Sequence, residues 1–178
     1  MSYRIIAEMS RNLGIGHYGR IPWDVKVDMR QFTKLTKGGG NNAVVMGRKT
    51  WESLACAPLK GRDNIVMSRT PVLVRNGELT AGIAQDISGV ISLCSSRDYD
   101  EVWIIGGADI YRQFLQHPIC SSCYLTYIDK HYPADAFFPL DVCDNRWVTE
   151  SASPLSNEGE TPRVELRIMI PCDSLRPI

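Results

Sequence analysis

The sequence has no excess of charge of either sign. Its 20 lysine and arginine residues balance 20 aspartate and glutamate residues, so the formal net charge at pH 7 is zero. An overall field strong enough to gather nucleic acid or an acidic membrane is therefore not expected, and a site for an anion has to be local. The sequence predicts neither a nucleic-acid partner nor a membrane partner.

Long hydrophobic runs are also lacking. No segment approaches the ~18 consecutive apolar residues that a membrane-spanning helix needs. The opening stretch, MSYRIIAEMSRN, contains a short apolar run but neither a charged leader followed by a long apolar segment nor a small-residue cleavage site. We therefore expect a soluble protein of the cytoplasm.

The cysteines do not form a disulfide or metal framework. Six are scattered along 178 residues, a length that can bury a core without disulfides, so reduced thiols are expected. Cys120 and Cys123 have the spacing of a redox pair or half a zinc site, but they lead into an apolar strand, and no second pair occurs. The sequence predicts no metal site.

The remaining pattern is that of one α/β domain over residues 1–178. Short runs rich in Val, Ile, Tyr and Trp predict strands at residues 3–9, 41–47, 63–69, 101–107 and 122–128. Helices are expected at residues 25–37, 50–54, 86–94 and 108–116, and a terminal antiparallel pair at 146–153 and 163–171. Because the strand runs are so uniformly apolar, we expect a central sheet with helices on both faces.

The stretch GIGHYG at residues 14–19 fits Gly-x-Gly-x-x-Gly, the fingerprint of a dinucleotide-binding turn. That turn leads straight into a helix and needs an acidic residue ~20 positions later. Pro22 stands where the helix should run, and Arg30 stands near the expected acid. We interpret residues 14–23 instead as a glycine-rich loop that can act as a lid.

One acidic residue interrupts the apolar face of the first predicted helix. Asp28, Phe32 and Leu35 follow at spacings of four and three, which places them on nearly one helix face. A carboxylate without a partner is costly to bury among apolar side chains. Asp28 is therefore either an acid at the exposed edge of the helix or a buried functional acid, and spacing alone favours the exposed edge.

Three predicted strands end in sequences that suit anions. They are VVMGRKTW at residues 44–51, IVMSRT at 65–70 and IIGGADIY at 104–111. Backbone amides at helix starts bind anions, and the adjacent arginines and lysine add positive charge. Each alone could be a solvated strand end, but three together in a chain without net charge favour a phosphate site.

These motifs, taken in order, resemble the dihydrofolate reductase family over nearly the whole chain. The matching stretches are IIAEMSRNLGIGHYGRIPWD, VDMRQF, VVMGRKTWESL, PLKGRDNIVMSR, VWIIGGADIY, YLTYID and ADAFFP. The resemblance implies a single-domain, three-layer α/β fold. Its central eight-stranded sheet is mostly parallel, with an antiparallel C-terminal hairpin and about four flanking helices.

The resemblance also implies an activity. A member of this family reduces 7,8-dihydrofolate with NADPH, transferring a hydride to C6 while N5 is protonated, and so supports one-carbon metabolism. It binds dihydrofolate and antifolate-type small molecules. We expect a monomer that can associate with a thymidylate synthase.

The resemblance assigns three catalytic residues. Asp28 matches the acid that hydrogen-bonds the amino group and ring nitrogen of the pterin. Trp23 matches the residue that helps to hold an ordered water near this acid, and Thr126 the hydroxyl that hydrogen-bonds it. Asp28 would hold and polarise the pterin so that N5 takes a proton from water.

The substrate-binding residues are assigned in the same way. Those around the pterin and aminobenzoyl rings are Ile6, Ala7, Glu8, Met29, Phe32, Leu54, Leu59 and Ile105. Arg62 matches the arginine that pairs with the carboxylate of the glutamate tail, which suits its planar fork of donors.

The cofactor-binding residues form three groups. Ala7, Ile15 and Gly16 match positions at the nicotinamide and its ribose. The phosphate and adenosine side is matched by Gly47, Arg48, Lys49, Thr50, Ser68 and Arg69, and the pyrophosphate side by Gly106, Gly107, Ala108, Asp109, Ile110 and Tyr111. Arg48 and Arg69 would select NADPH through its 2′-phosphate, and the Gly106–Gly107 peptide bond is cis in the family.

Two departures from the family pattern stand out. Glu8 replaces the usual small apolar residue beside the pterin, where a second carboxylate could raise the pKa of Asp28 or alter inhibitor binding, unless its side chain points away. Residues 72–85, which should supply part of the adenine pocket, show no clear family pattern.

Two other functions remain open from the sequence. A reductase of riboflavin synthesis shares the fold, but it would need a ribose-phosphate site instead of Arg62 and Phe32. A binding module that kept the NADPH cleft and lost turnover is argued against by Asp28, Trp23 and Thr126.

Overall fold

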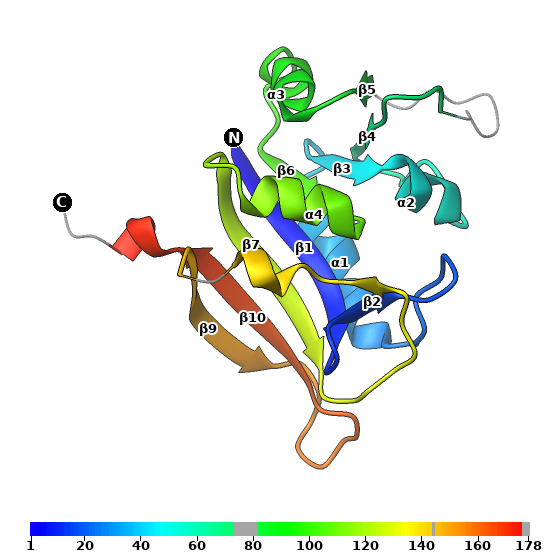
Figure 1. Ribbon diagram of the computed structural model, residues 1–178, viewed down its shortest axis with the longest axis vertical. Helices are drawn as coiled ribbons and strands as arrows, with labels where there is room; N and C mark the ends of the chain where they lie inside the picture. Colours follow the sequence, from blue (N-terminus) through cyan, green and yellow to red (C-terminus); the bar gives the residue numbers. More distant parts are fainter. Residues whose placement is uncertain (73–81, 144, 176–178) are drawn as a thin grey trace.

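An eight-stranded sheet organises the chain in the computed structural model, which describes residues 1–72, 82–143 and 145–175. Its strands are β1 (Ser2–Ser10), β3 (Ala43–Gly47), β4 (Asp63–Met67), β5 (Gly82–Ala84), β6 (Glu101–Ile104), β7 (Cys120–Ile128), β9 (Trp147–Pro154) and β10 (Val164–Pro171). They lie in the order β5-β4-β3-β6-β1-β7-β10-β9. Figure 1 shows β5 and the β9–β10 hairpin at opposite edges of this sheet.

The sheet is parallel from β5 to β7 and antiparallel at its C-terminal edge. β1 pairs in parallel with β6 and β7, and β3 pairs in parallel with β4 and β6. β10 runs antiparallel to both β7 and β9. Parallel neighbours need a crossover connection, usually a helix, whereas β9 and β10 are joined by a loop. The predicted mostly parallel sheet with an antiparallel C-terminal hairpin is confirmed.

Strand β1 shows how the two sides of the sheet are filled. Tyr3, Ile5 and Ala7 belong to the larger hydrophobic core, while Ile6 belongs to the smaller one. Successive side chains of a strand point to opposite faces, so odd and even positions of β1 serve different cores. The uniformly apolar strand sequences therefore reflect burial on both faces, as the sequence predicted.

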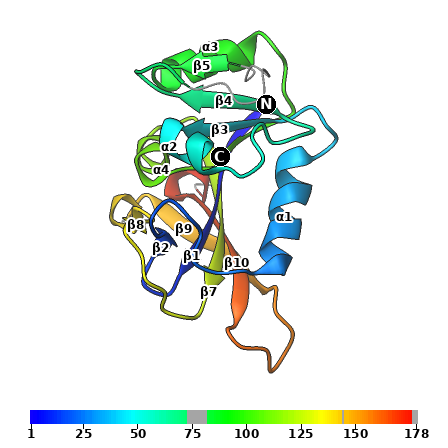
Figure 2. The ribbon, with the colours of Figure 1, turned by 90° about the vertical axis from the view of Figure 1, so that its right-hand side faces the viewer.

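Helices cover both faces. The α-helices of the described residues are α1 (Lys26–Lys37), α2 (Arg48–Ser53), α3 (Ile87–Ser95) and α4 (Ala108–Leu115), with short 3₁₀ turns at Leu140–Val142 and Cys172–Leu175. Phe32 of α1 and Trp51 of α2 join the smaller core, whereas Val90 of α3 and Phe114 of α4 join the larger one. Figure 2 shows α1 and α4 on opposite sides of the central strands. The predicted three layers are confirmed.

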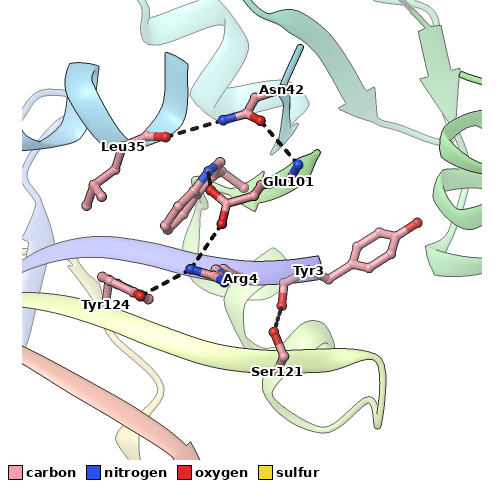
Figure 3. Close-up of polar contacts among 8 residues, drawn as sticks. Tyr3, Arg4, Leu35, Asn42, Glu101, Ser121 and Tyr124 are labelled. Atoms are coloured by element: carbon pink, nitrogen blue, oxygen red, sulfur yellow. Dashed lines mark hydrogen bonds and ion pairs between the residues drawn. The ribbon is translucent and has the colours of Figure 1, made fainter. Parts of the chain in front are cut away.

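A polar network fixes the amino-terminal part of the sheet beneath α1 (Figure 3). Arg4 forms an ion pair with Glu101 at 3.0 Å and donates a hydrogen bond to the Tyr124 hydroxyl at 3.2 Å. Asn42 joins this network to the helix, since it accepts from the Glu101 amide at 3.1 Å and donates to the Leu35 carbonyl at 3.3 Å. These contacts set the position of α1 over β1, β6 and β7.

Short elements differ from the sequence-based predictions. Helix α2 begins at Arg48, two residues before the predicted start at residue 50, because Gly47 is the extended residue that precedes it. The strands β2 (Gly14–Gly16) and β8 (Ala136–Phe137), which pair with each other, were not predicted, and neither was β5. Strands of two or three residues are too short to show a period.

Candidate active site

Asp28 lies in the first turn of α1 and is buried, with 7% of its surface exposed. Phe32 and Leu35 pack on the smaller core, so the helical period turns Asp28 toward the sheet as well. The interpretation of Asp28 as an acid at the exposed edge of the helix is therefore wrong. Burial raises the pKa of Asp28, and side-chain hydrogen bonds from Thr126 and Glu8 lower it in part.

Glu8 brings a second carboxyl group to the same place. It is the register partner of Thr126 in the pairing of β1 with β7, and like Ile6 it lies on the α1 side of the sheet. Burial and then the charge of Asp28 raise the pKa of Glu8 to about 8. The alternative that its side chain points away from the site is wrong.

The two carboxyl groups influence each other. A second carboxylate could raise the pKa of Asp28 or alter inhibitor binding; the pKa of Asp28 is raised, mainly by burial, while the hydrogen bond from Glu8 lowers it in part. Of the two carboxyl groups, Glu8 is the one whose pKa is raised by the charge of its neighbour. Glu8 is therefore the one that holds a proton more readily.

Trp23 closes this pocket from the loop before α1. Its indole nitrogen Nε1 and the Glu8 oxygen Oε1 are both buried and make no hydrogen bond of good geometry among the described residues, although the indole acts on Glu8 as a donor that lowers its pKa. The Trp23 ring packs on the Tyr132 ring, with 5.2 Å between the ring centroids. The Asn12 side chain hydrogen-bonds the backbone carbonyl and amide of Tyr132. Because buried polar groups are normally paired, these atoms offer one donor and one acceptor to a ligand or a water.

Apolar side chains extend from the acids along the α1 side of the sheet. The expected wall residues that pack on the smaller core are Ile6, Phe32, Leu54, Leu59 and Ile105. Two expected wall residues lie differently: Ala7 faces the larger core, and Met29 is 58% exposed on α1. An apolar surface therefore adjoins a buried carboxyl pair, which suits a flat ring with one polar edge.

Arg62 lies at the far end of the same surface. Its guanidinium lies over the Phe32 ring, 5.8 Å from the ring centroid. It also donates hydrogen bonds to the Thr36 hydroxyl and, from Nε, to the Lys60 carbonyl at 3.3 Å. Partial burial lowers its pKa. Arg62 is thus held as a fixed cation beside the carboxy-terminal end of α1, separate from Asp28 in its first turn.

The three strand ends that suit anions meet at one edge of the sheet. β3 lies between β4 and β6 in the strand order, and Gly47 is the register partner of Met67. The Gly47 amide also donates to the Gly106 carbonyl at 2.7 Å. The sequences 44–51, 65–70 and 104–111 are therefore brought together, as the phosphate interpretation requires.

Helices α2 and α4 start at glycines. Gly47 and Gly107 are the N-cap residues, and neither helix has a side-chain cap. A Cβ at Gly47 would lie 3.0 Å from Ile110 Cγ1, and one at Gly107 would lie 3.4 Å from Thr50 Oγ1, so the glycines permit close packing of the two helix starts. Uncapped first-turn amides can receive an anion. The expected cis bond between Gly106 and Gly107 is confirmed.

Most basic and polar side chains at this edge are accessible. Lys49 and Arg69 are exposed, and Arg48 forms an ion pair with Glu52 at 2.7 Å. The Ser68 hydroxyl donates to the Thr70 carbonyl at 2.7 Å. A guanidinium has five donors, so Arg48 retains capacity for a phosphate beside Glu52.

Two residues predicted to contact the cofactor turn inward instead. Ile110 and Tyr111 are buried in the larger core, and the Tyr111 hydroxyl donates to the Ile6 carbonyl at 2.9 Å. Their side chains support the packing of α4 on β1, and their contact with a cofactor stays a prediction. Ala108 and Asp109 begin the helix beside them.

The loop of residues 14–23 is tied to the fold at its start. Gly14 belongs to β2, and a Cβ there would lie 2.6 Å from the Ala134 Cβ, so this glycine permits a close approach. Gly19 has φ +72° in a tight turn, which hydrogen bonds of 2.8 and 3.0 Å close between His17 and Arg20. Gly14 thus permits close packing, and Gly19 permits the turn, while the role of these glycines in a lid stays a prediction.

The Cys120–Cys123 pair lacks the features of a redox site. Both thiols are buried in β7, and burial raises the pKa of Cys120 to about 12 and raises that of Cys123 well above its ordinary value. A reactive pair needs an accessible thiolate. Residues 1–72, 82–143 and 145–175 contain no group of three metal-binding side chains, and no helix there is long and apolar enough to cross a membrane.

Comparisons with known proteins agree with this geometry. A sequence model described as dihydrofolate reductase matches residues 2–169. A dihydrofolate reductase of Heliothis virescens is 36% identical over 165 residues, which are 88% of this chain and 89% of that protein. One of Candida albicans is 36% identical over 163 residues, 85% of this chain and 81% of that protein.

Other relatives are longer than this chain. A bifunctional dihydrofolate reductase-thymidylate synthase of Daucus carota is 34% identical over 149 residues, 78% of this chain but 28% of that protein. The chain thus spans about a third or less of the bifunctional proteins that it matches. A solved structure, the dihydrofolate reductase of Enterococcus faecalis with NADP(H) and RAB-propyl, has a TM-score of 0.77 at 24% identity, with 97% of both chains covered. This last likeness shows the fold.

Proposed function

The chain belongs to the dihydrofolate reductase family, and from this premise we propose that it reduces 7,8-dihydrofolate to 5,6,7,8-tetrahydrofolate with NADPH. One domain over residues 1–178 carries the reaction. The cofactor supplies a hydride from nicotinamide C4, which forms the new bond at pterin C6, while N5 gains a proton. The protein's share is to bind and orient both rings and to control water.

The observation that carries the proposal is the buried Asp28 beside an apolar surface. Its carboxylate can accept from both the amino group and the ring nitrogen of a pterin, and the Thr126 hydroxyl holds it in place. Phe32 and Ile105 lie along the ring and aminobenzoyl region. An unpaired carboxylate would be costly to bury, so a ligand with two donors at one edge satisfies this site.

Protonation of N5 depends on water access. Asp28 binds the opposite edge of the pterin and holds the ring, so N5 takes its proton from a water molecule. The buried Nε1 of Trp23 can hold a water beside Asp28, and the loop of residues 14–23 controls entry to that space. Loop closure is thus coupled to the protonation step.

The strand-end site fits NADPH. The uncapped starts of α2 and α4 provide amides for the pyrophosphate and the other phosphate, and glycines at 47 and 107 let these two starts pack closely. Arg48 and Arg69 bind the 2′-phosphate, which selects NADPH over NADH. Ala7, Ile15 and Gly16 lie at the nicotinamide end. Adenine contacts are expected in residues 72–85, of which 73–81 lie outside the described residues.

Arg62 binds the glutamate tail of the substrate. Its guanidinium is fixed over Phe32 by the Thr36 hydroxyl and the Lys60 carbonyl, at the end of the apolar surface farthest along α1 from Asp28. A fixed planar fork matches a carboxylate better than a mobile cation does. Pterin, linker and tail are thereby placed in order along α1.

A spectrophotometric assay tests this function. Purified protein should oxidise NADPH only when dihydrofolate is present, and methotrexate should inhibit it. The riboflavin-pathway aminopyrimidine ribose phosphate serves as the alternative substrate. If the protein binds folate and NADPH but does not turn over dihydrofolate, it is a binding module and the proposed enzyme function is wrong.

Several finer properties belong to the same proposal. We infer that the enzyme acts as a monomer in the cytoplasm, that antifolate-type molecules occupy the pterin pocket, and that it associates with a thymidylate synthase. The bifunctional relatives, whose names join both activities, support this association. Size-exclusion chromatography with and without thymidylate synthase measures both points.

A further inference from the structure

The pterin pocket contains one more carboxyl group than the proposed binding mode uses. Glu8 faces Asp28 of α1, Thr126 of β7, and Trp23 and Asp24 of the preceding loop. Among these, the indole of Trp23 favours a charged Glu8, whereas Asp28 and, to a smaller extent, Asp24 oppose it. Within the described part of the chain, no basic side chain is among the groups that act on Glu8. Glu8 is therefore not half of an ion pair.

Two facing acids without a cation cannot both be ionised at neutral pH. Asp28 has the better hydrogen-bond partners, since both Thr126 and Glu8 bond to its charged form. Glu8 therefore keeps the proton and directs it to Asp28. A protonated carboxyl group can donate once and still accept hydrogen bonds on its oxygens.

The protein uses the accepting capacity of Glu8 only in part. The Trp23 indole acts on Glu8 as a donor, but the buried Oε1 makes no hydrogen bond of good geometry among the residues described. Thr126, the register partner of Glu8, is already engaged with Asp28. A ligand that occupies the pocket can supply a further donor.

The 2-amino group of a pterin has two hydrogens, and a carboxylate that also binds the adjacent ring nitrogen takes only one of them. Resting on the function proposed above, we propose that Glu8 is a specificity-determining residue. Its carboxyl group shares a proton with Asp28 and accepts the second hydrogen of the ligand's 2-amino group. Glu8 and Asp28 together then accept hydrogen bonds from both hydrogens of that group.

Paired ligands isolate this contact. The ligands are folate and 2-deaminofolate, in which hydrogen replaces the 2-amino group, and their Kd values are measured by tryptophan fluorescence at saturating NADP⁺ and neutral pH. The wild-type protein should prefer folate. In Glu8→Ala this preference should fall about fivefold, because one hydrogen bond to the amino group is lost while that of Asp28 remains.

Glu8→Gln is the conservative variant. Its amide matches the protonated acid in size and supplies both a donor to Asp28 and an accepting oxygen. It should therefore keep the preference for folate within about twofold of the wild type, as should the control Glu150→Gln, which changes an exposed residue of β9. Glu8→Val fills the space with apolar atoms and should behave like Glu8→Ala.

The outcomes separate this inference from the proposed function. If the wild-type protein reduces dihydrofolate but Glu8→Ala and Glu8→Val keep its full preference for folate, Glu8 does not contact the amino group and the inference is wrong. Loss of the preference in Glu8→Gln as well would show that the acid acts in another way and would also overturn it. If the wild-type protein does not turn over dihydrofolate, the proposed function fails whatever the preference is.

Discussion

The backbone amide of Gly47 donates a hydrogen bond of 2.7 Å to the carbonyl oxygen of Gly106. This bond joins the carboxyl ends of β3 and β6, whose following helices begin without side-chain caps. It therefore fixes the separation of two helix starts whose amides face the same space. The proposed phosphate site depends on this spacing, and on the absence of side chains at the glycines that set it.

Replacing Gly106 with alanine should damage both stability and cofactor binding. Gly106 has φ +103°, a conformation that L side chains rarely adopt, and a Cβ would lie 2.9 Å from Tyr111 Cζ. We expect Gly106→Ala to lower the free energy of unfolding by about 1–3 kcal/mol in urea denaturation and to weaken NADPH. The control Gly39→Ala has nothing within 4 Å of its Cβ and should change neither quantity. Equal effects in both variants would contradict the packing argument.

Replacing Asp28 with asparagine should remove the charge that holds the pterin. We expect Asp28→Asn to lose about 10²-fold in kcat/KM for dihydrofolate near neutral pH, while the Kd of NADPH stays unchanged. The amide keeps the shape of the acid, so the loss reports its charge. Asp100→Asn, at an exposed residue before β6, is the matched control. Unchanged turnover in Asp28→Asn would refute the assignment of the acid.

The strands that the sequence predicted well are those buried on both faces. Residues of β3 and β7 form apolar runs because each strand packs on two cores, and this pattern is visible without a structure. The edge strand β5 and the β2–β8 pair could not be predicted in this way, because they are only two or three residues long and are fixed by pairing with distant partners. Their positions follow from tertiary structure.

The sequence predicted which residues form the candidate site better than it predicted their burial and protonation. Helical spacing placed Asp28 with Phe32 but could not decide whether that face was buried. Asp28 is buried because its helix face packs over the neighbouring strands β1 and β7. This pairing brings Glu8 and Thr126 to the acid from distant parts of the sequence. The proton balance between Glu8 and Asp28 likewise depends on this burial and could not be inferred from residue types alone.

Replacing Arg62 with alanine should weaken only ligands that have a glutamate tail. The guanidinium is fixed over Phe32 and hydrogen-bonded to Thr36, so it is pre-oriented for a carboxylate. We expect the Kd of folate to rise about tenfold in Arg62→Ala, and that of a tail-free pterin to stay unchanged. An equal loss for both ligands would place Arg62 in the support of α1 instead of the tail site.

Replacing Arg69 with alanine should reduce the preference for NADPH over NADH. Arg69 is exposed just beyond β4, beside the strand ends that meet at Gly47. Removing a cation from the 2′-phosphate should raise the Kd of NADPH about tenfold and leave that of NADH unchanged. Arg163→Ala, at an exposed arginine just before β10, controls for overall charge. A uniform loss for both cofactors would count against the role in the 2′-phosphate site.

Replacing Glu8 with glutamine should make the stability of the ligand-free protein less dependent on pH. Folding raises the pKa of Glu8 from 4.5 to about 8, so between these values the folded protein retains a proton that the unfolded chain has released. Stability due to this group is therefore lost as the pH rises, by up to ~1.4 kcal/mol for each pH unit. Glutamine cannot titrate, so the stability of Glu8→Gln relative to the wild type should increase from about pH 5 to about pH 8 in urea denaturation.

The exposed-site variant Glu150→Gln separates this effect from a general change of charge. Its stability relative to the wild type should be constant over the same range, because residue 150 is exposed on the edge strand β9 and is not among the groups that act on Glu8. If the difference between Glu8→Gln and the wild type were also constant with pH, Glu8 would release its proton as freely in the fold as in water. Glu8 and Asp28 would then not share a proton. The proposal that Glu8 accepts a hydrogen bond from the 2-amino group would then lack its premise.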